Sequence, residues 1–168
     1  MDKRGRVLDV VGVLARLVVG GVWIAAGLLK LPDPTENVRA VRAYQLLPEA
    51  IVPTLGHLLP IIEIVVGGCL VLGLLLRPMA ILSAVLLVAF IVGIASAWAR
   101  GLEIECGCFG GGGGPAQGAS KKYPWELARD VGLLAASLLI AWRPRLPLAV
   151  DQLLFPAPES DPDGEAEL

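Results

Sequence analysis

The sequence predicts an all-α fold, a polytopic membrane protein built as a bundle of four transmembrane helices. Of its 168 residues 55% are hydrophobic and only 18% are charged, whereas soluble domains have about 45–50% apolar and about 25% charged residues. The apolar residues also gather into long blocks, and about 20 of them in a row match the thickness of a bilayer core. The lipid bilayer is therefore an expected partner, and the net charge of −2 argues against nucleic acid.

Three blocks have the length and composition of membrane spans, and a fourth is weaker. The four spans are expected at about 7–29, 54–76, 79–99 and 125–142. The strictly apolar part of the fourth begins only at Val131, so we expect Glu126, Arg129 and Asp130 in its first turns, near the membrane interface. Residues 1–143 then form one four-helix membrane domain.

The stretch DPTENVRAVRAYQLLP, between the first two spans, carries the start signals of a short helix. Asp33 can cap the helix, Pro34 suits its first position, and Glu36 completes an arrangement like a capping box. We expect a helix over 34–45 that lies on the membrane surface.

The other connections set the expected orientation. Arg77-Pro78 predicts a tight turn between the second and third spans, and residues 144–168, rich in proline and acid, predict a disordered tail. Basic residues are dense in the short segments on the N-terminal side and diluted over two long loops on the other side. This favours a plasma-membrane protein with both termini in the cytoplasm, and with Cys106 and Cys108 on the outer face.

Two charged residues, Arg16 and Glu63, lie well inside the first two spans. At the bilayer centre each would cost about 2.5–3.5 kcal/mol, unless it faces the interior of the bundle. Both lie on stripes of small residues, which are typical of a close helix–helix contact. We therefore expect Arg16 and Glu63 to pair across that contact. A proton-relay or quinone-contacting role for Glu63 stays open as an alternative.

The segment IECGCFGGGGG holds two of the three cysteines, Cys106 and Cys108, one residue apart. On the outer face they meet an oxidising compartment, where disulfides persist. Residues two apart lie at the upper edge of the separation of about 4.4–6.8 Å that a disulfide favours, so such a bond would be strained and easily reduced. Because it would link residues only two apart in the chain, such a disulfide would add little stability, which favours a role in electron exchange.

Other roles of this segment stay open. Two thiolates can hold a soft ion such as Cu(I), and the thiols can also be structural or unpaired. Arg129, at the mouth of the fourth span, is expected to favour the thiolate, with Glu126 and Asp130 opposing it. The glycines that follow Phe109 are expected to act as a flexible linker.

Three stretches carry a resemblance to a known family. GGVWIAAGLLKLPDP, LPIIEIVVGGCLVLGL and ARGLEIECGCFGG, the last followed by PWELARDVGLL, resemble the MauE branch of the DoxX-like membrane family over roughly residues 10–142. The resemblance implies a four-helix inner-membrane protein. It further implies kinship with a factor implicated in maturing the disulfide-rich small subunit of methylamine dehydrogenase, and with relatives linked to quinone-coupled sulfur chemistry.

The expected function is thus a thiol–disulfide redox or maturation factor that acts through Cys106 and Cys108. Its partner would be an extracytoplasmic thioredoxin-like or disulfide-containing protein, and a quinone is the candidate cofactor. Whether the chain is an enzyme, a membrane thiol–disulfide oxidoreductase, stays open. The competing classes are a non-catalytic assembly or scaffold protein and a small-solute carrier that uses Arg16 and Glu63.

Overall fold

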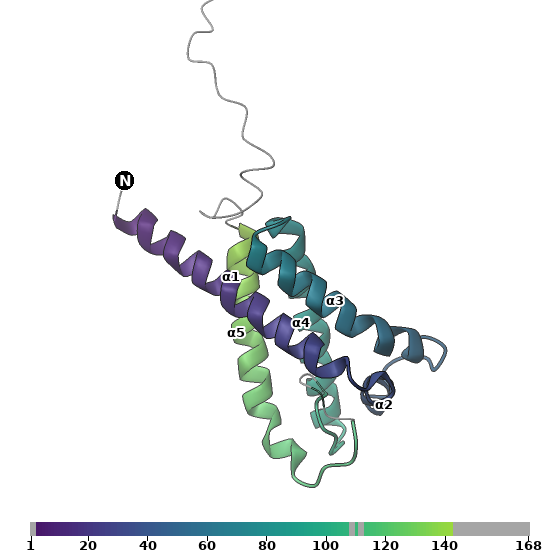
Figure 1. Ribbon diagram of the computed structural model, residues 1–168. Coiled ribbons are helices and arrows are strands. Elements are labelled where there is room, and N and C mark those ends of the chain that lie inside the picture. Colours follow the sequence, from purple (N-terminus) through teal and green to yellow (C-terminus); the bar gives the residue numbers. More distant parts are fainter. Residues whose placement is uncertain (1–2, 108–109, 111–112, 143–168) are drawn as a thin grey trace, which may run out of the picture.

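The computed structural model describes residues 3–107, 110 and 113–142, and over these residues the protein is all-helical. In chain order the elements are α1 (Lys3–Lys30), α2 (Pro34–Ala43), α3 (Val52–Leu72), α4 (Leu76–Ala99), the 3-10 helix η1 (Ala119–Lys121) and α5 (Tyr123–Trp142) (Figure 1). Cys108 and the predicted tail, 144–168, lie outside the described residues.

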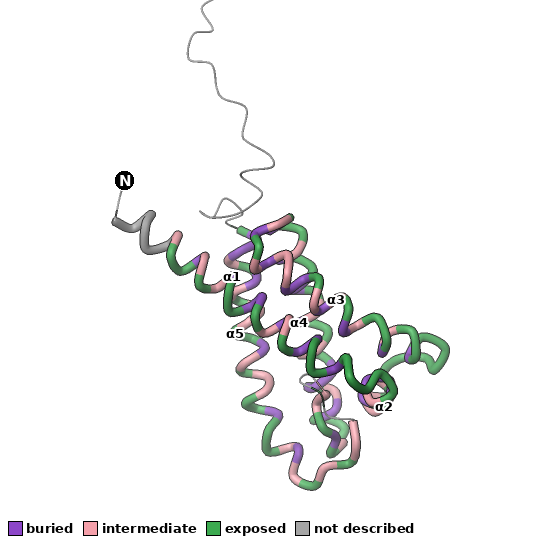
Figure 2. Tube along the Cα trace, in the orientation of Figure 1, coloured by how far each residue is buried: buried purple, intermediate pink, exposed green. Residues whose placement is uncertain are grey.

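Three helices of the described part are long and apolar enough to cross a membrane, namely Asp9–Lys30 of α1, α3 and α4. Their outward faces carry large exposed apolar side chains, for example Val18 at 57%, Val65 at 53% and Val85 at 59% exposure. Figure 2 shows these exposed positions alternating with buried ones along each helix. An apolar outer surface of this kind suits a lipid environment, and the chain is a membrane protein.

The helix α5 is not one of those three, so the fourth span stays a prediction. It has 20 residues, and its first turns contain Glu126, Arg129 and Asp130. Asp130 is buried at 2% exposure, and the Arg129 guanidinium donates to its Oδ1 over 2.9 Å. Pairing within one turn lowers the cost of placing these two charges against the bundle.

The contact between α1 and α3 is a close approach of two backbones, as the small-residue stripes predict. A Cβ added at Gly67 would lie 2.6 Å from the Gly20 oxygen, and one added at Gly27 would lie 2.7 Å from the Pro60 oxygen. The two helices run antiparallel and side by side (Figure 1). Gly56 belongs to a different contact, because its added Cβ would meet Val38 of α2.

The turn between α3 and α4 lies earlier in the chain than predicted. Gly73 adopts the left-handed conformation (φ 75°) and ends α3, and the Leu74 amide donates to the Cys69 oxygen over 2.9 Å. Glycine takes this conformation without strain, and the hydrogen bond satisfies an orphan carbonyl of the last turn. Arg77-Pro78 instead lies in the first turn of α4, where proline needs no hydrogen-bonded amide.

The short helix α2 confirms the predicted start at Asp33. The Asp33 carboxylate accepts from the Glu36 amide over 3.0 Å. The Thr35 hydroxyl and then the Glu36 amide lower the pKa of Asp33, because both donate to its charged form. The helix ends at Ala43, two residues before the predicted end, and Gln45 then turns the chain with a φ of 52°.

A chain of buried hydroxyl groups joins α1 to α4 and α5. Trp23 Nε1 donates to Ser83 Oγ over 2.7 Å, and Ser83 Oγ lies 2.9 Å from Ser137 Oγ. Ser137 in turn donates to the Leu133 oxygen over 2.9 Å. Because Ser83 and Ser137 are fully buried, these bonds satisfy polar groups that would otherwise cost free energy inside the bundle.

The α1–α3 contact gives a first prediction, with a matched control in the neighbouring residue. Gly67→Ala places a methyl group against the α1 backbone, so we expect the free energy of unfolding to fall by about 1–3 kcal/mol. Gly68→Ala, whose added Cβ has nothing within 4 Å, should be neutral or slightly stabilising. Thermal unfolding of both variants in detergent measures the difference. Equal stability of the two would contradict a close contact at Gly67.

Candidate functional site

Tyr123, the first residue of α5, anchors the cysteine loop, which we define as residues 101–118 between α4 and η1. The Ile104 amide donates to Tyr123 Oη over 3.1 Å, and the Tyr123 hydroxyl donates to the Leu102 oxygen over 2.8 Å. The side chain is buried at 2% exposure. The loop also folds back on itself, since the Ala116 amide donates to the Glu103 oxygen over 3.0 Å. This part of the loop is therefore held in one place.

Tyr44, directly after α2, holds the loop at Cys106 itself. Its hydroxyl donates to the Cys106 oxygen over 2.7 Å and lies 3.4 Å from Cys106 Sγ. The Arg100 guanidinium, at the end of α4, donates to the Tyr44 oxygen. The connection between α1 and α3 thus meets the cysteine loop at the same end of the bundle. Because Cys108 lies outside the described residues, a Cys106–Cys108 pair stays a prediction.

Two glycines shape the described part of this loop. Gly107, directly after Cys106, has a φ of 67°, a conformation that side chains disfavour. Gly113 has a φ of 59°, and a Cβ added there would lie 2.5 Å from the Ala40 Cα of α2. Gly113 therefore packs closely on α2, a role that the interpretation as a linker did not include.

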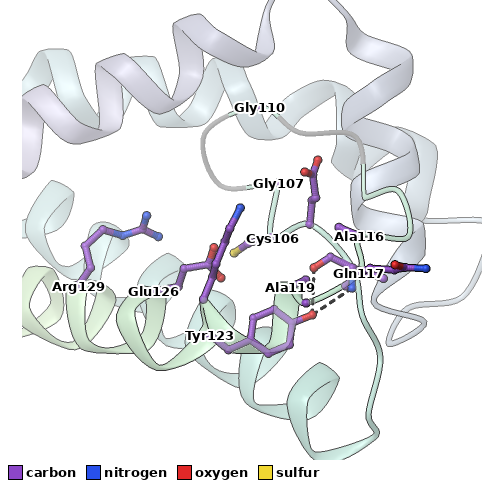
Figure 3. Close-up of a pocket in the computed structure, with 13 residues that line it drawn as sticks. Cys106, Gly107, Gly110, Ala116, Gln117, Ala119, Tyr123, Glu126 and Arg129 are labelled. Atoms are coloured by element: carbon purple, nitrogen blue, oxygen red, sulfur yellow. Dashed lines mark hydrogen bonds between the residues drawn. The ribbon is translucent and has the colours of Figure 1, made fainter.

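A polar cavity of about 220 Å³ lies beside Cys106, between the cysteine loop and the start of α5 (Figure 3). Glu105, Lys122, Glu126 and Arg129 contribute its charged groups. Glu126 Oε2 is buried and finds no hydrogen-bond partner among the described residues. The Arg129 guanidinium lies 2.8 Å from Asp130 Oδ1, so much of its charge is balanced locally. Its expected support of a Cys106 thiolate stays a prediction.

A second cavity, of about 290 Å³, lies on the other side of Cys106 and is mainly apolar. Leucines from the 46–59 region line it together with residues of α4, among them Phe90. Lys30 and Tyr44 supply its polar groups. Cys106 and Gly107 line both cavities. The cysteine loop is therefore a wall between a polar cavity and an apolar one.

Glu63 pairs with Lys30, and the expected pair with Arg16 is wrong. Lys30 Nζ donates to Glu63 Oε1 over 2.5 Å, with both side chains buried. The helix register explains the outcome. Gly20 lies against Gly67 and Val71, so Arg16 is level with residues beyond Val71, about 15 Å along α3 from Glu63. Lys30 ends α1 near the level of Pro60, from where its long side chain reaches Glu63.

Arg16 is itself buried, at 4% exposure, so both charges face the bundle interior as predicted. The sequence contained a sign of the observed partner of Glu63, because Lys30 lies on the same face of the first helix as Gly20 and Gly27. The tyrosines were missed altogether. Both tyrosines of the chain contact the cysteine loop, and their closeness in sequence to the two long loops was the available hint.

Within the described residues, no three His, Cys, Asp or Glu side chains gather into a site for a metal ion. The two-thiolate Cu(I) alternative involves Cys108 and so lies partly outside the described residues. The described site therefore brings the Cys106 thiol together with the carboxylates of Glu105 and Glu126, the ammonium group of Lys122 and two cavities.

Fold and site together define a class of protein: an all-helical membrane protein whose cysteine loop separates two cavities at one end of the bundle. The chain belongs to the MauE family, since residues 8–143 match the family described as "Methylamine utilisation protein MauE". This match includes the three apolar helices from Leu8 onward, the cysteine loop and α5.

Two curated relatives bear the name "Methylamine utilization protein MauE". The protein of Paracoccus denitrificans is 33% identical over 128 residues, which cover 75% of this chain and 66% of that protein. The protein of Methylorubrum extorquens is 34% identical over 120 residues, or 70% of this chain and 61% of that protein. The chain thus aligns with less than two thirds of the length of either relative. No solved structure matches it.

The buried ion pair gives a second prediction. Glu63→Gln strands the Lys30 charge and Lys30→Met strands the Glu63 charge, so each should destabilise the protein by about 3–5 kcal/mol. The double variant removes both charges and should recover much of this loss. Folded protein in the membrane fraction and thermal unfolding report the effect.

Two further variants serve as controls for this pair. Arg42→Gln, which breaks the exposed pair of Arg42 with Glu49, should leave the amount of folded protein unchanged. Rescue of Glu63→Gln by Arg16→Gln, in place of Lys30→Met, would contradict the observed pairing.

A third prediction concerns the anchor of the cysteine loop. Tyr123→Phe leaves the buried Ile104 amide and the Leu102 oxygen without their partner, so the free energy of unfolding should fall by about 1–3 kcal/mol. The loop should also become more accessible, measured as faster alkylation of its cysteines. Trp125→Phe, at a side chain that is 75% exposed, is the control and should change neither quantity. An unchanged alkylation rate in Tyr123→Phe would argue against the anchoring role.

Proposed function

We propose that this chain is a membrane thiol–disulfide redox or maturation factor that acts through Cys106 and Cys108 on an extracytoplasmic partner. The observation that carries the proposal is the place of Cys106, which is fixed by Tyr44 and lines both a polar and an apolar cavity. A cysteine with a purely structural role needs neither cavity. The names of the curated relatives suggest that the partner takes part in methylamine utilisation.

The proposed reaction is disulfide exchange. A partner thiolate attacks one sulfur of the Cys106–Cys108 disulfide, which breaks and leaves one thiol on this chain and a mixed disulfide with the partner. The partner's second thiol then attacks the mixed disulfide. The partner leaves with a new disulfide, and this chain keeps two thiols together with the two electrons. A membrane electron acceptor must then reoxidise Cys106 and Cys108.

The polar cavity supplies suitable groups for this exchange. The charge of Lys122 favours a thiolate at Cys106 and that of Glu105 opposes it. The half-buried Glu126 carboxylate can accept the proton that an attacking thiol gives up. The proposed partner is a thioredoxin-like or disulfide-containing protein, because the exchange needs a partner with a pair of thiols. Both oxidation and repair of partner disulfides use the same exchange.

The proposal includes an orientation in which both termini are cytoplasmic and the cysteine loop faces outward. Two observations support it. α2 and the cysteine loop share one end of the bundle through the Tyr44–Cys106 bond, and the α3–α4 turn, followed by Arg77 in the first turn of α4, lies at the other end (Figure 1). The start of α1 at Lys3 and the start of α4 with Arg77 lie at that other end, the side that would face the cytoplasm under the positive-inside rule.

A covalent trap tests this function. The exchange is reversible, so a thiol of this chain can also attack the disulfide of an oxidised partner, and the second thiol of this chain then releases the partner. Deleting that resolving cysteine should leave the partner attached. We expect Cys106→Ser or Cys108→Ser, whichever removes the resolving thiol, to accumulate an adduct that dithiothreitol releases. The double variant should form none. Cys69→Ser, in the membrane-spanning α3, is the matched control and should behave as the wild type.

The partner in the adduct, identified by mass spectrometry, also reports the orientation of the loop. An extracytoplasmic protein supports the proposal, and a cytoplasmic protein contradicts it. A double variant that still supports function, with no adduct in any variant, would favour a scaffold role and overturn the redox proposal.

A further inference from the structure

The apolar cavity has the size and lining of a small-molecule site. Its volume of about 290 Å³ lies at the lower end of the range of about 300–1,000 Å³ for ligand pockets. It suits one substituted ring better than a whole lipid. Leu55 and Leu59 of α3 and Leu86 and Phe90 of α4 contribute to its walls. Leu46, at its edge, is 47% exposed, so apolar surface continues from the cavity toward the lipid.

Lys30 gives this apolar cavity one polar end. Lys30 lines the cavity and is 4% exposed, and its ammonium group lies 5.6 Å from the centre of the ring of Phe90, which also lines the cavity. An ammonium group has three N–H donors, and among the described residues only Glu63 Oε1 accepts from it. Glu63 Oε2, fully buried, has no hydrogen-bond partner among the described residues. Unmet polar capacity at such depth is rare in native proteins and points to a ligand.

The charge of the pair selects the kind of polar group that a ligand can bring. Lys30 and Glu63 sum to zero, so an anionic headgroup would gain from Lys30 and lose to Glu63. A neutral hydrogen-bond acceptor, such as a carbonyl oxygen, uses the free N–H donors of Lys30 without that cost. A planar ring also fits beside the aromatic face of Phe90.

From these observations we infer that the apolar cavity is the site of a lipid-soluble quinone, with one carbonyl oxygen accepting from Lys30 and the ring between Phe90 and Cys106. The inference rests on the proposed function and supplies its electron acceptor. The Cys106 and Cys108 thiols give up two electrons and two protons and form their disulfide, and the quinone is reduced to the quinol. Cys106 meets the partner from the polar cavity and the quinone from the apolar one.

Direct binding to the purified full chain in lipid nanodiscs tests this site, with decylubiquinone as the probe. We expect saturable binding at one molecule per chain by titration calorimetry. Ala89→Trp places a bulky side chain in the cavity wall from an exposed position and should weaken binding at least tenfold. Val88→Trp, on the next residue, which is exposed and does not line the cavity, is the matched control and should bind as the wild type.

A second comparison separates recognition of the ring from simple apolar partitioning. 1-Decanol, which has a tail of the same length without the quinone ring, should bind at least tenfold more weakly than decylubiquinone. Equal binding of the two, or equal binding by Ala89→Trp and Val88→Trp, would overturn the assignment of the cavity. The Lys30→Met/Glu63→Gln double variant, which keeps the charges balanced, should also lose affinity for decylubiquinone.

The failure of this inference can be told apart from the failure of the proposed function. The covalent partner trap, repeated in an Ala89→Trp background, should still form its adduct. An adduct without quinone binding would overturn the quinone site and leave the exchange function standing. Quinone binding without an adduct in any variant would overturn the exchange function alone.

Discussion

Direct backbone contact between α1 and α3 sets the positions of the buried charges and of the connection into α2, at the end of the bundle that carries the cysteine loop. Within a bilayer the surrounding lipid is as apolar as a leucine side chain, so helices associate through close packing and not through burial from water. The glycines at positions 20, 27 and 67 allow that approach, and each fits against the backbone of the facing helix. This contact fixes the register in which Lys30 meets Glu63 and from which the chain continues into α2.

The Lys30–Glu63 ion pair is buried between the apolar helices α1 and α3. Each charge alone would be costly there, and removing one member would leave the other uncompensated. The Asn37 side chain donates to the Lys30 oxygen over 2.8 Å, so α2 is also tied to this end of α1. The pair therefore links the packing of three helices to the lining of the apolar cavity.

The cysteine loop depends on contacts from outside itself. Tyr123 fixes its backbone on one side of Cys106, Tyr44 fixes Cys106, and Gly113 packs on α2. A loop supported in this way presents its thiol at a defined place, which matters for exchange, since attack on a disulfide requires access along a defined line.

The sequence by itself determined the three apolar helices and the start of α2 at Asp33, because block length and capping are local properties. It also predicted the small-residue contact between α1 and α3, since helical periodicity defines a face. Periodicity does not define register, so only the tertiary structure decided that Glu63 meets Lys30 and not Arg16. The Tyr44–Cys106 bond joins residues 62 apart in the chain, and the two cavities arise from several helices at once; such features exist only after packing.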